Sequence, residues 1–181
     1  PAAVLYHAEA EWGGRYQPFE EIVKLLMQNQ IDCEVVWSDL LTDLEKSCMK
    51  DGELQINGES FRVLLVPYAE YLPCALMERL QEFAEEGLPV IFLKDYPERS
   101  YFGRKFIPQA GMRKSNEETL IPLLEKLDIR DIIPMEKKEQ LAYYHYRKEN
   151  IDWYFFVNEG LTDTIFTNIR FRDKREACFY D

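Results

Sequence analysis

Short apolar runs alternate with amphipathic segments through the first two thirds of the chain, and this alternation limits the possible folds more than any other feature. The runs occupy residues 3–6, 32–37, 62–66 and 89–93. Continuous apolar runs are typical of strands in a parallel sheet that helices cover on both faces. The pattern predicts a three-layer α/β domain with a mostly parallel, flavodoxin-like sheet, in which run 3–6 pairs with run 62–66.

The segments between the runs have apolar residues at helical spacing. One helix is expected to begin at Pro18, a second to run from Pro73 to a stop at Gly87, and a third to begin at Ser115 or Asn116.

Residues 38–61 are less regular. Ser38 or Asp39 can cap a segment with apolar residues out to Met49, and the dipeptide Asn57-Gly58 favours a type I′ hairpin turn. We therefore expect a helix and then a hairpin between the second and third runs.

The pattern changes after Pro134. Residues 141–148 and 151–157 are rich in aromatic side chains and join at Glu149-Asn150, which predicts an antiparallel hairpin. Residues 165–171 alternate in polarity, and residues 176–181 indicate a last strand. We expect an α/β domain over residues 1–134 and an antiparallel β extension over 135–181. A chain that starts and stops in predicted strands is expected to be a piece of a longer one.

Composition excludes some partners. There are 33 acidic and 22 basic residues, a formal net charge of -11. Such a charge disfavours nucleic acid and anionic membrane surfaces. No apolar run approaches the roughly 18–20 residues that span a bilayer. No signal segment is recognisable, and a cytoplasmic location is favoured.

The cysteines and glycines point away from catalysis. Cys33, Cys48, Cys74 and Cys178 have no CxxC spacing and lie in apolar-periodic stretches, so buried free thiols are expected. The sequence contains no G-x-S-x-G, G-x-C-x-G, Walker or G-x-G-x-x-G motif. We expect no catalytic residue, cofactor or metal in this chain.

Ligands of open parallel sheets bind beyond the carboxyl ends of the strands, where the strand order reverses. Here the loops after runs 3–6 and 62–66 flank that point. Aromatic faces in these loops could stack on a sugar ring while carboxylates accept its hydroxyl hydrogen bonds. The candidate ligand-binding residues are Glu9, Glu11, Trp12, Tyr16 and Glu70.

A structural interpretation of the same residues competes with this one. Trp12 lies beside Gly13-Gly14 and could be a buried anchor for its own loop, with Glu9 or Glu11 bonded to the backbone or to Arg15. We favour this interpretation, because such a tryptophan more often locks a loop than contacts a ligand.

His7, Glu9 and Glu11 would share one face if the first strand continued, and could then hold a metal or supply an acid–base pair. Neighbouring carboxylates are closer than a glycosidase pair requires, and no second histidine is near. His145, within an aromatic strand, is expected to be structural.

Four segments support a family resemblance. The strings VLYHAEAEWGG, QIDCEVV, FRVLLVPYAEYLP and LPVIFLKDYPE resemble the glutamine-amidotransferase-like domain of multidomain glycoside hydrolases. This domain is similar to the trimerisation domain of family 42 β-galactosidases and to related rhamnosidases. The resemblance implies a preceding (β/α)8 barrel and a following β-sandwich as partners in the same chain, and other subunits of a homo-oligomer.

The resemblance breaks down at the nucleophile. Amidotransferases carry a cysteine on a glycine-flanked elbow, and the matching residues Phe92-Leu93-Lys94-Asp95 contain neither residue type. We expect that this chain cannot easily build such an elbow. The resemblance then implies a non-catalytic module of a glycoside hydrolase, with a role in assembly, domain packing or an accessory sugar site. The alternative is a small-molecule or carbohydrate-binding domain that uses the crevice at the carboxyl ends of the strands.

Overall fold

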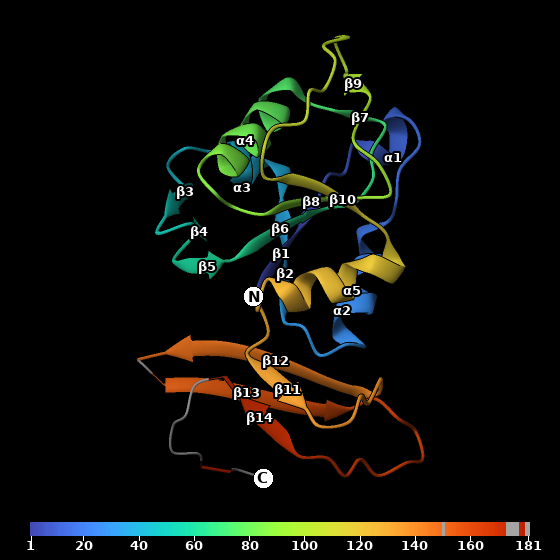
Figure 1. The fold of residues 1–181 in the computed structure, drawn as a ribbon, viewed down its shortest axis with the longest axis vertical. Helices are drawn as coiled ribbons and strands as arrows, with labels where there is room; N and C mark the ends of the chain where they lie inside the picture. The colour runs from blue at the N-terminus through green and yellow to red at the C-terminus, as the bar shows by residue number, and fades with distance from the viewer. Residues whose placement is uncertain (150, 173–177, 180–181) are drawn as a thin grey trace.

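A five-stranded parallel sheet forms the centre of the protein, as the computed structural model in Figure 1 shows. The structure describes residues 1–149, 151–172 and 178–179. The strand order is β10-β8-β6-β1-β2, and all neighbours are parallel. The strands are β1 (Ala2–Tyr6), β2 (Cys33–Trp37), β6 (Val63–Val66), β8 (Val90–Leu93) and β10 (Met112–Ser115). The predicted fold class and the pairing of the first and third runs are confirmed.

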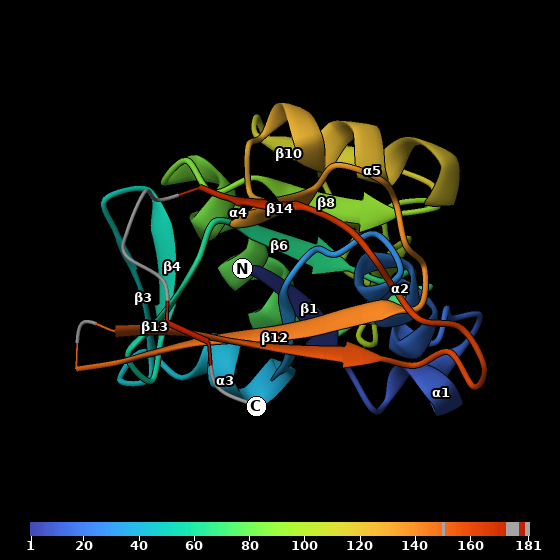
Figure 2. The same ribbon diagram turned by 90° about the horizontal axis from the view of Figure 1, so that it is seen from below.

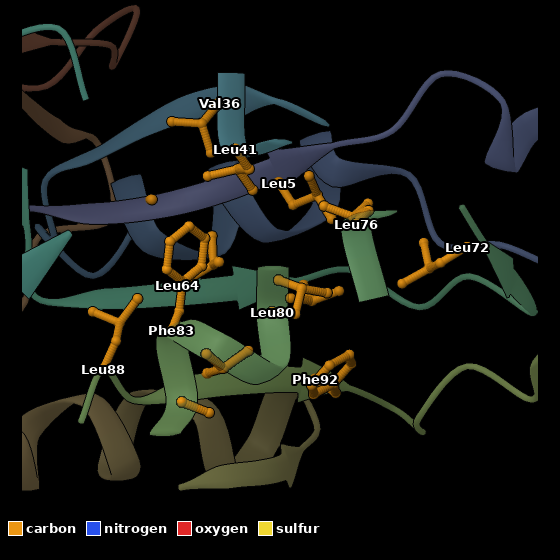
Figure 3. Packing of buried hydrophobic residues seen from close by; sticks show 14 of the residues in the cluster. Leu5, Val36, Leu41, Leu64, Leu72, Leu76, Leu80, Phe83, Leu88 and Phe92 are labelled. Carbon is orange, nitrogen blue, oxygen red and sulfur yellow. The ribbon is translucent and has the colours of Figure 1, made fainter. Parts of the chain in front are cut away.

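Helices cover both faces of this sheet. The helices α2 (Phe19–Met27) and α5 (Glu117–Lys126) bury one face, and α3 (Ser38–Thr42) and α4 (Cys74–Glu85) bury the other. Alternation along β1 divides its side chains, with Ala2 and Val4 in the first core and Ala3 and Leu5 in the second. Figure 3 shows this second core, where Leu5 lies near side chains of α3 and α4.

The expected helix boundaries hold at four points. Pro18 and Pro73 are the N-cap residues of α2 and α4. Asn116 caps α5, where its side chain accepts a hydrogen bond from the Thr119 amide at 2.9 Å. Gly87 follows α4 with φ +99°. A short helix that the sequence did not predict, α1 (Ala10–Gly13), follows β1.

The segment between α3 and β6 forms a small antiparallel sheet. Its strands are β3 (Ser47–Lys50), β4 (Glu53–Ile56) and β5 (Glu59–Phe61). Positive φ at both Asn57 and Gly58 confirms the predicted turn. The expected extension of α3 to Met49 is wrong, because the Asp43 carboxylate accepts the Glu45 amide hydrogen bond, and Met49 pairs with Leu54 instead.

In the described residues, four antiparallel strands follow α5, seen from below in Figure 2. The first ends at residue 134, and the other three belong to the predicted extension. The four strands are β11 (Ile132–Pro134), β12 (Leu141–Lys148), β13 (Ile151–Asn158) and β14 (Ile169–Phe171). The predicted β12–β13 hairpin is confirmed, and β11 pairs with β14. The strand expected over 165–171 is shorter than predicted, and most of the strand expected over 176–181 lies outside the described residues. The division at residue 134 stays a prediction.

Two short strands complete the fold, β7 (Tyr71–Leu72) and β9 (Arg99–Ser100), which pair in parallel. The expectation of buried thiols is wrong for Cys48 and Cys178, which are exposed, and Cys33 and Cys74 are only partly buried. Among the described residues, no helix has the length and apolar character needed to cross a bilayer.

Candidate functional site

The crevice predicted between the loops after β1 and β6 exists, but it is nearly closed. The two loops are joined by backbone hydrogen bonds, from Gln17 to the Tyr68 carbonyl and from Glu70 to the Arg15 carbonyl, each at 2.8 Å. Side chains that include Tyr16 fill the space, and the remaining volume is about 20 Å³. This is room for about one water molecule. In this structure a sugar could contact the rim of the crevice and not its interior.

Glu70 holds the loop after β1 through hydrogen bonds with Arg15. Its carboxylate accepts hydrogen bonds from the Arg15 amide and from Arg15 Nε, both at 3.0 Å. Arg15 also donates to Glu98 at 2.8 Å. The hydrogen bonds from Arg15 and from the Tyr71 hydroxyl lower the pKa of Glu70 to about 2. Glu70 therefore serves as an anionic anchor between three loops.

Tyrosine rings pack closely against Gly13 and Gly14. A Cβ at Gly13 would lie 2.8 Å from the Tyr101 ring, and one at Gly14 would lie 2.8 Å from the Tyr71 ring. A larger residue at either position would require the ring to shift. The two rings thus contact the loop that carries Trp12.

His7 connects this loop to the loop after β9. It is buried, with Nδ1 2.9 Å from Glu9 Oε2 and Nε2 3.0 Å from the Tyr101 hydroxyl. Burial lowers the pKa of His7, and the neighbouring Glu9 carboxylate opposes that shift. The strand ends at Tyr6, so the shared face proposed for His7, Glu9 and Glu11 does not form; Glu11 lies in α1.

Trp12 contradicts the structural interpretation that the sequence favoured. Its side chain is 82% exposed at the end of the braced loop, so it does not anchor that loop. Tyr16 is also exposed, and Glu11 lies on the exposed rim beside Trp12. Glu9 is paired with His7. Of the five candidates, Glu11, Trp12 and Tyr16 form an exposed rim, whereas Glu9 and Glu70 hold the loops through His7 and Arg15. Ligand binding by the five residues stays a prediction.

The elbow position has an unexpected backbone. Lys94 directly follows β8 and has φ +66°, in the left-handed region. Its amide donates to the Ser115 carbonyl at 2.7 Å, which ties it to the end of β10. The residue at this place is a lysine, and β8 is followed by β9 and not by a helix. The expectation that this chain does not easily build an amidotransferase elbow stays a prediction.

A second polar cluster joins the α/β part to the extension. His145 Nδ1 lies 2.8 Å from Asp131 Oδ2, and its Nε2 lies 3.1 Å from Asp152 Oδ1. The Tyr143 hydroxyl donates to Asp131 and accepts from the Asp32 amide at 3.1 Å. Sequence reasoning assigned His145 a structural role, but its partners are too distant along the chain to be recognised.

Charge and burial shift the pKa values in this cluster. Burial alone would lower the pKa of His145, but hydrogen bonds to Asp131 and Asp152 raise it overall. Burial raises the pKa of Asp32 to about 6, against the opposing charge of the chain's amino group. Asp32, Asp131 and His145 bring possible metal ligands within 4.8 Å of one another, but a metal would compete with the hydrogen bonds that already use both His145 nitrogens.

The comparisons with known proteins bear on the fold. The sequence matches no protein-family model and no curated protein. Among solved structures, it is similar to the crystal structure of apo exo-carrageenase GH42 from Bacteroides ovatus, with a TM-score of 0.55 and 12% sequence identity. The similarity covers 88% of this chain and 23% of that chain, so the chain spans less than a quarter of the enzyme's length. The correspondence is one of fold, with a part of a glycoside hydrolase chain.

Proposed function

We propose that this chain is a non-catalytic domain of a larger glycoside hydrolase. The observation that carries the proposal is the fold correspondence with 23% of the GH42 exo-carrageenase chain. The family resemblance of the sequence points in the same direction. On this proposal, a catalytic barrel and a β-sandwich of the same polypeptide are the immediate partners.

Lys94 supports the non-catalytic part of the proposal. It occupies the place where an amidotransferase carries its cysteine. A lysine nucleophile is activated by desolvation or by a neighbouring cation. The Lys94 side chain is 51% exposed, and its ammonium group lies 3.8 Å from the Glu21 carboxylate. This environment resembles an ordinary surface ion pair.

Trp12 supports an accessory contact role. A large apolar side chain that is held outward by a braced loop has no packing function in the domain itself. Its flat face suits a sugar ring, and tryptophan is also enriched at the centres of protein interfaces. We assign Trp12 and the neighbouring Glu11 and Tyr16 to a contact with the sugar site or with another domain or subunit of the parent enzyme.

The proposal is tested first on the 181-residue chain. We expect the purified chain to hydrolyse neither chromogenic glycosides nor glutamine, and we expect the reading frame around it to encode a barrel. Turnover of either substrate by this chain, abolished in Lys94→Ala, would overturn the non-catalytic assignment.

The contact role is tested in the parent enzyme. Trp12→Ala should reduce activity or assembly of the parent while its melting temperature stays unchanged. Phe102→Ala is the matched control, because Phe102 is 93% exposed on the neighbouring loop after β9 and is not assigned to the contact. Equal effects of the two variants would count against a specific role for Trp12.

A further inference from the structure

A second cavity lies where the two parts of the chain meet. Its wall includes Asn29 and Gln30 after α2, Glu125 and Asp128 at the end of α5, and Ile133 of β11. Figure 1 shows α2 and α5 directly above β11. Its volume of about 390 Å³ is far larger than that of the crevice and lies within the range of roughly 300–1,000 Å³ found for small-molecule sites. We name it the seam pocket.

The seam pocket and the crevice lie at opposite ends of the sheet. The crevice follows the carboxyl ends of β1 and β6, whereas Gln30 precedes the amino end of β2. All strands of the sheet are parallel, so the two cavities lie at opposite ends of the strands. A ligand in the seam pocket would therefore contact none of the rim residues around Trp12.

Gln30 leaves a hydrogen-bond acceptor at the pocket. Its side chain is buried, and its amide nitrogen donates to the carbonyl oxygens of Lys138 and Leu141, both at 2.8 Å. Within the described residues, no donor is bonded to its amide oxygen. Buried polar atoms normally have a partner. An acceptor that remains open beside a cavity suits a ligand that donates.

The charged groups of the wall balance one another. Glu125 and Asp128 are acidic, and Arg130 and Lys137 are basic. Arg130 donates to Glu125 at 3.0 Å, and Lys137 is paired with Glu139 at 3.1 Å. Asp128 is paired with Arg172 at 2.9 Å. Arg130 Nε is buried and has no hydrogen-bond partner within the described residues. A neutral ligand leaves the ion pairs intact, and a hydroxyl group can accept from Arg130 Nε as well as donate to the Gln30 oxygen.

The ends of two helices lie at the pocket. Gln30 and Asp128 have φ of +49° and +50°, and they follow α2 and α5, where left-handed residues commonly end helices. The Asn29 carbonyl already accepts from Arg130, and the Asp128 carbonyl accepts from Arg62 and Arg172, so these helix ends are satisfied. Ile133 and Pro134 add an apolar surface to the wall. The pocket thus offers the Gln30 oxygen as an acceptor together with an apolar surface.

We propose that the seam pocket binds a neutral polyhydroxyl molecule of mono- or disaccharide size. Its hydroxyl groups would donate to the Gln30 oxygen and to the Asp128 carboxylate beside Arg172, and its apolar face would lie on Ile133 and Pro134. Such a ligand bridges the α/β part and the extension. This site is additional to the contact assigned to Trp12 and does not depend on it.

The test is an NMR titration of the ¹⁵N-labelled 181-residue chain with galactose. We expect concentration-dependent shifts of the Gln30 and Asn29 side-chain amides and of the backbone amides around Ile133. The absence of these shifts overturns the proposal. Shifts confined to residues around Trp12 overturn it as well, while they favour the proposed accessory contact, so the two failures are distinguishable.

Variants test whether galactose binds in the seam pocket and not elsewhere on the chain. Ile133→Trp should fill the pocket and weaken binding about tenfold or more, whereas Leu161→Trp adds the same side chain at a fully exposed position outside the pocket and should leave binding unchanged. Should Ile133→Trp fail to fold, Asp128→Gly removes a carboxylate at a position whose φ suits glycine, and it should also weaken binding. Unchanged affinity in the folded variants, or tighter binding of galactose 6-sulfate or galactosamine than of galactose, overturns the proposal.

Discussion

The α/β part and the β extension use apolar side chains in different ways. In the α/β part each central strand is covered on both faces, and β1, β6 and β8 are buried almost throughout. In the β12–β13 hairpin, one face carries Tyr143, whose side chain bonds to groups of the α/β part. The other face carries Tyr144 and Phe155, which are 49% and 51% exposed.

This difference separates two sources of stability. The α/β part is held by burial of apolar area, which does not depend on single contacts. A two-stranded hairpin is marginal alone. This one is joined to the remainder through the buried residues 141–143 at the start of β12 and by directional contacts from Gln30, Tyr143 and His145. We call these contacts between the two regions the seam. The comparison predicts large losses in the free energy of global unfolding from substitutions in the α/β core. Substitutions at the seam should lower the stability of the hairpin alone.

The largest effect is expected in the α/β core. Phe83 is fully buried between α4 and the sheet, so Phe83→Ala should reduce the free energy of unfolding by about 3–5 kcal/mol. Phe155→Ala removes the same side chain from the exposed hairpin face and should cost about 0.5–1 kcal/mol. Urea denaturation measures both. Similar losses would show that the hairpin face is buried in solution, and the contrast between the regions would fail.

Tyr143→Phe tests the seam. The change removes the hydroxyl that joins Asp131 Oδ1 to the Asp32 amide. The amide loses this partner and the Asp131 carboxylate keeps the one from His145, at a cost of about 1–3 kcal/mol. Hydrogen exchange should accelerate in β12 and β13 and stay unchanged in β1. Tyr144→Phe is the control, because the structure shows no hydrogen bond from that hydroxyl within the described residues. Equal acceleration in β1 would mean that the two regions unfold as one unit.

His145 should make the seam sensitive to pH. Its pKa is raised in the folded state by Asp131 and Asp152, so its stabilising contribution is complete below the unfolded value of about 6.5 and is lost as the pH rises through the folded value. The contribution of Asp32 to stability also falls as the pH rises. Burial raises its pKa to about 6, so folding favours its protonated form. Acid conditions around pH 6 should therefore strengthen the seam relative to pH 8.

The measurement compares melting temperatures of the wild type and His145→Gln from pH 5.5 to pH 8. The difference should be worth about 1 kcal/mol at the acid end and should shrink toward the alkaline end. Arg147, which lies 3.3 Å from Asp152, is present in both proteins and does not contribute to the difference. A difference that grows with rising pH would contradict the assignment of His145 as a cation at the seam.

Much of the fold could be predicted because the local signals agree with the tertiary structure. The runs that became β1, β6 and β8 are apolar on both faces, and proline, asparagine and glycine mark the helix ends. The strand β10 was missed because Arg113 and Lys114 are exposed at this edge of the sheet, and only Met112 and Ser115 are buried there. Its sequence is too polar to indicate a strand of a covered sheet.

The position of the crevice could also be predicted from the sequence, but its closure could not. Strand order determines which loops meet, so the loops after β1 and β6 could be named in advance. Closure of the crevice and support of the Trp12 loop depend on Tyr101, which is 94 residues from its partner His7. A single sequence carries no signal for such a contact. The seam pocket was missed for the same reason, since its wall comes from residues that meet only after folding.

The smallest effect is expected at Lys94, the residue with positive φ directly after β8. A left-handed conformation costs a non-glycine residue about 1–2 kcal/mol, and glycine loses about 0.5–1 kcal/mol more conformational entropy on folding than alanine does. Lys94→Gly should therefore stabilise the protein by about 0.5–1 kcal/mol, since the ion pair to Glu21 at 3.8 Å is exposed and weak. Arg113→Gly, at an exposed position within β10, should destabilise by a similar amount because its backbone is ordinary strand. Chemical denaturation of the two variants compares them directly. A loss of stability in both would mean that the turn after β8 does not hold Lys94 in a left-handed conformation in solution.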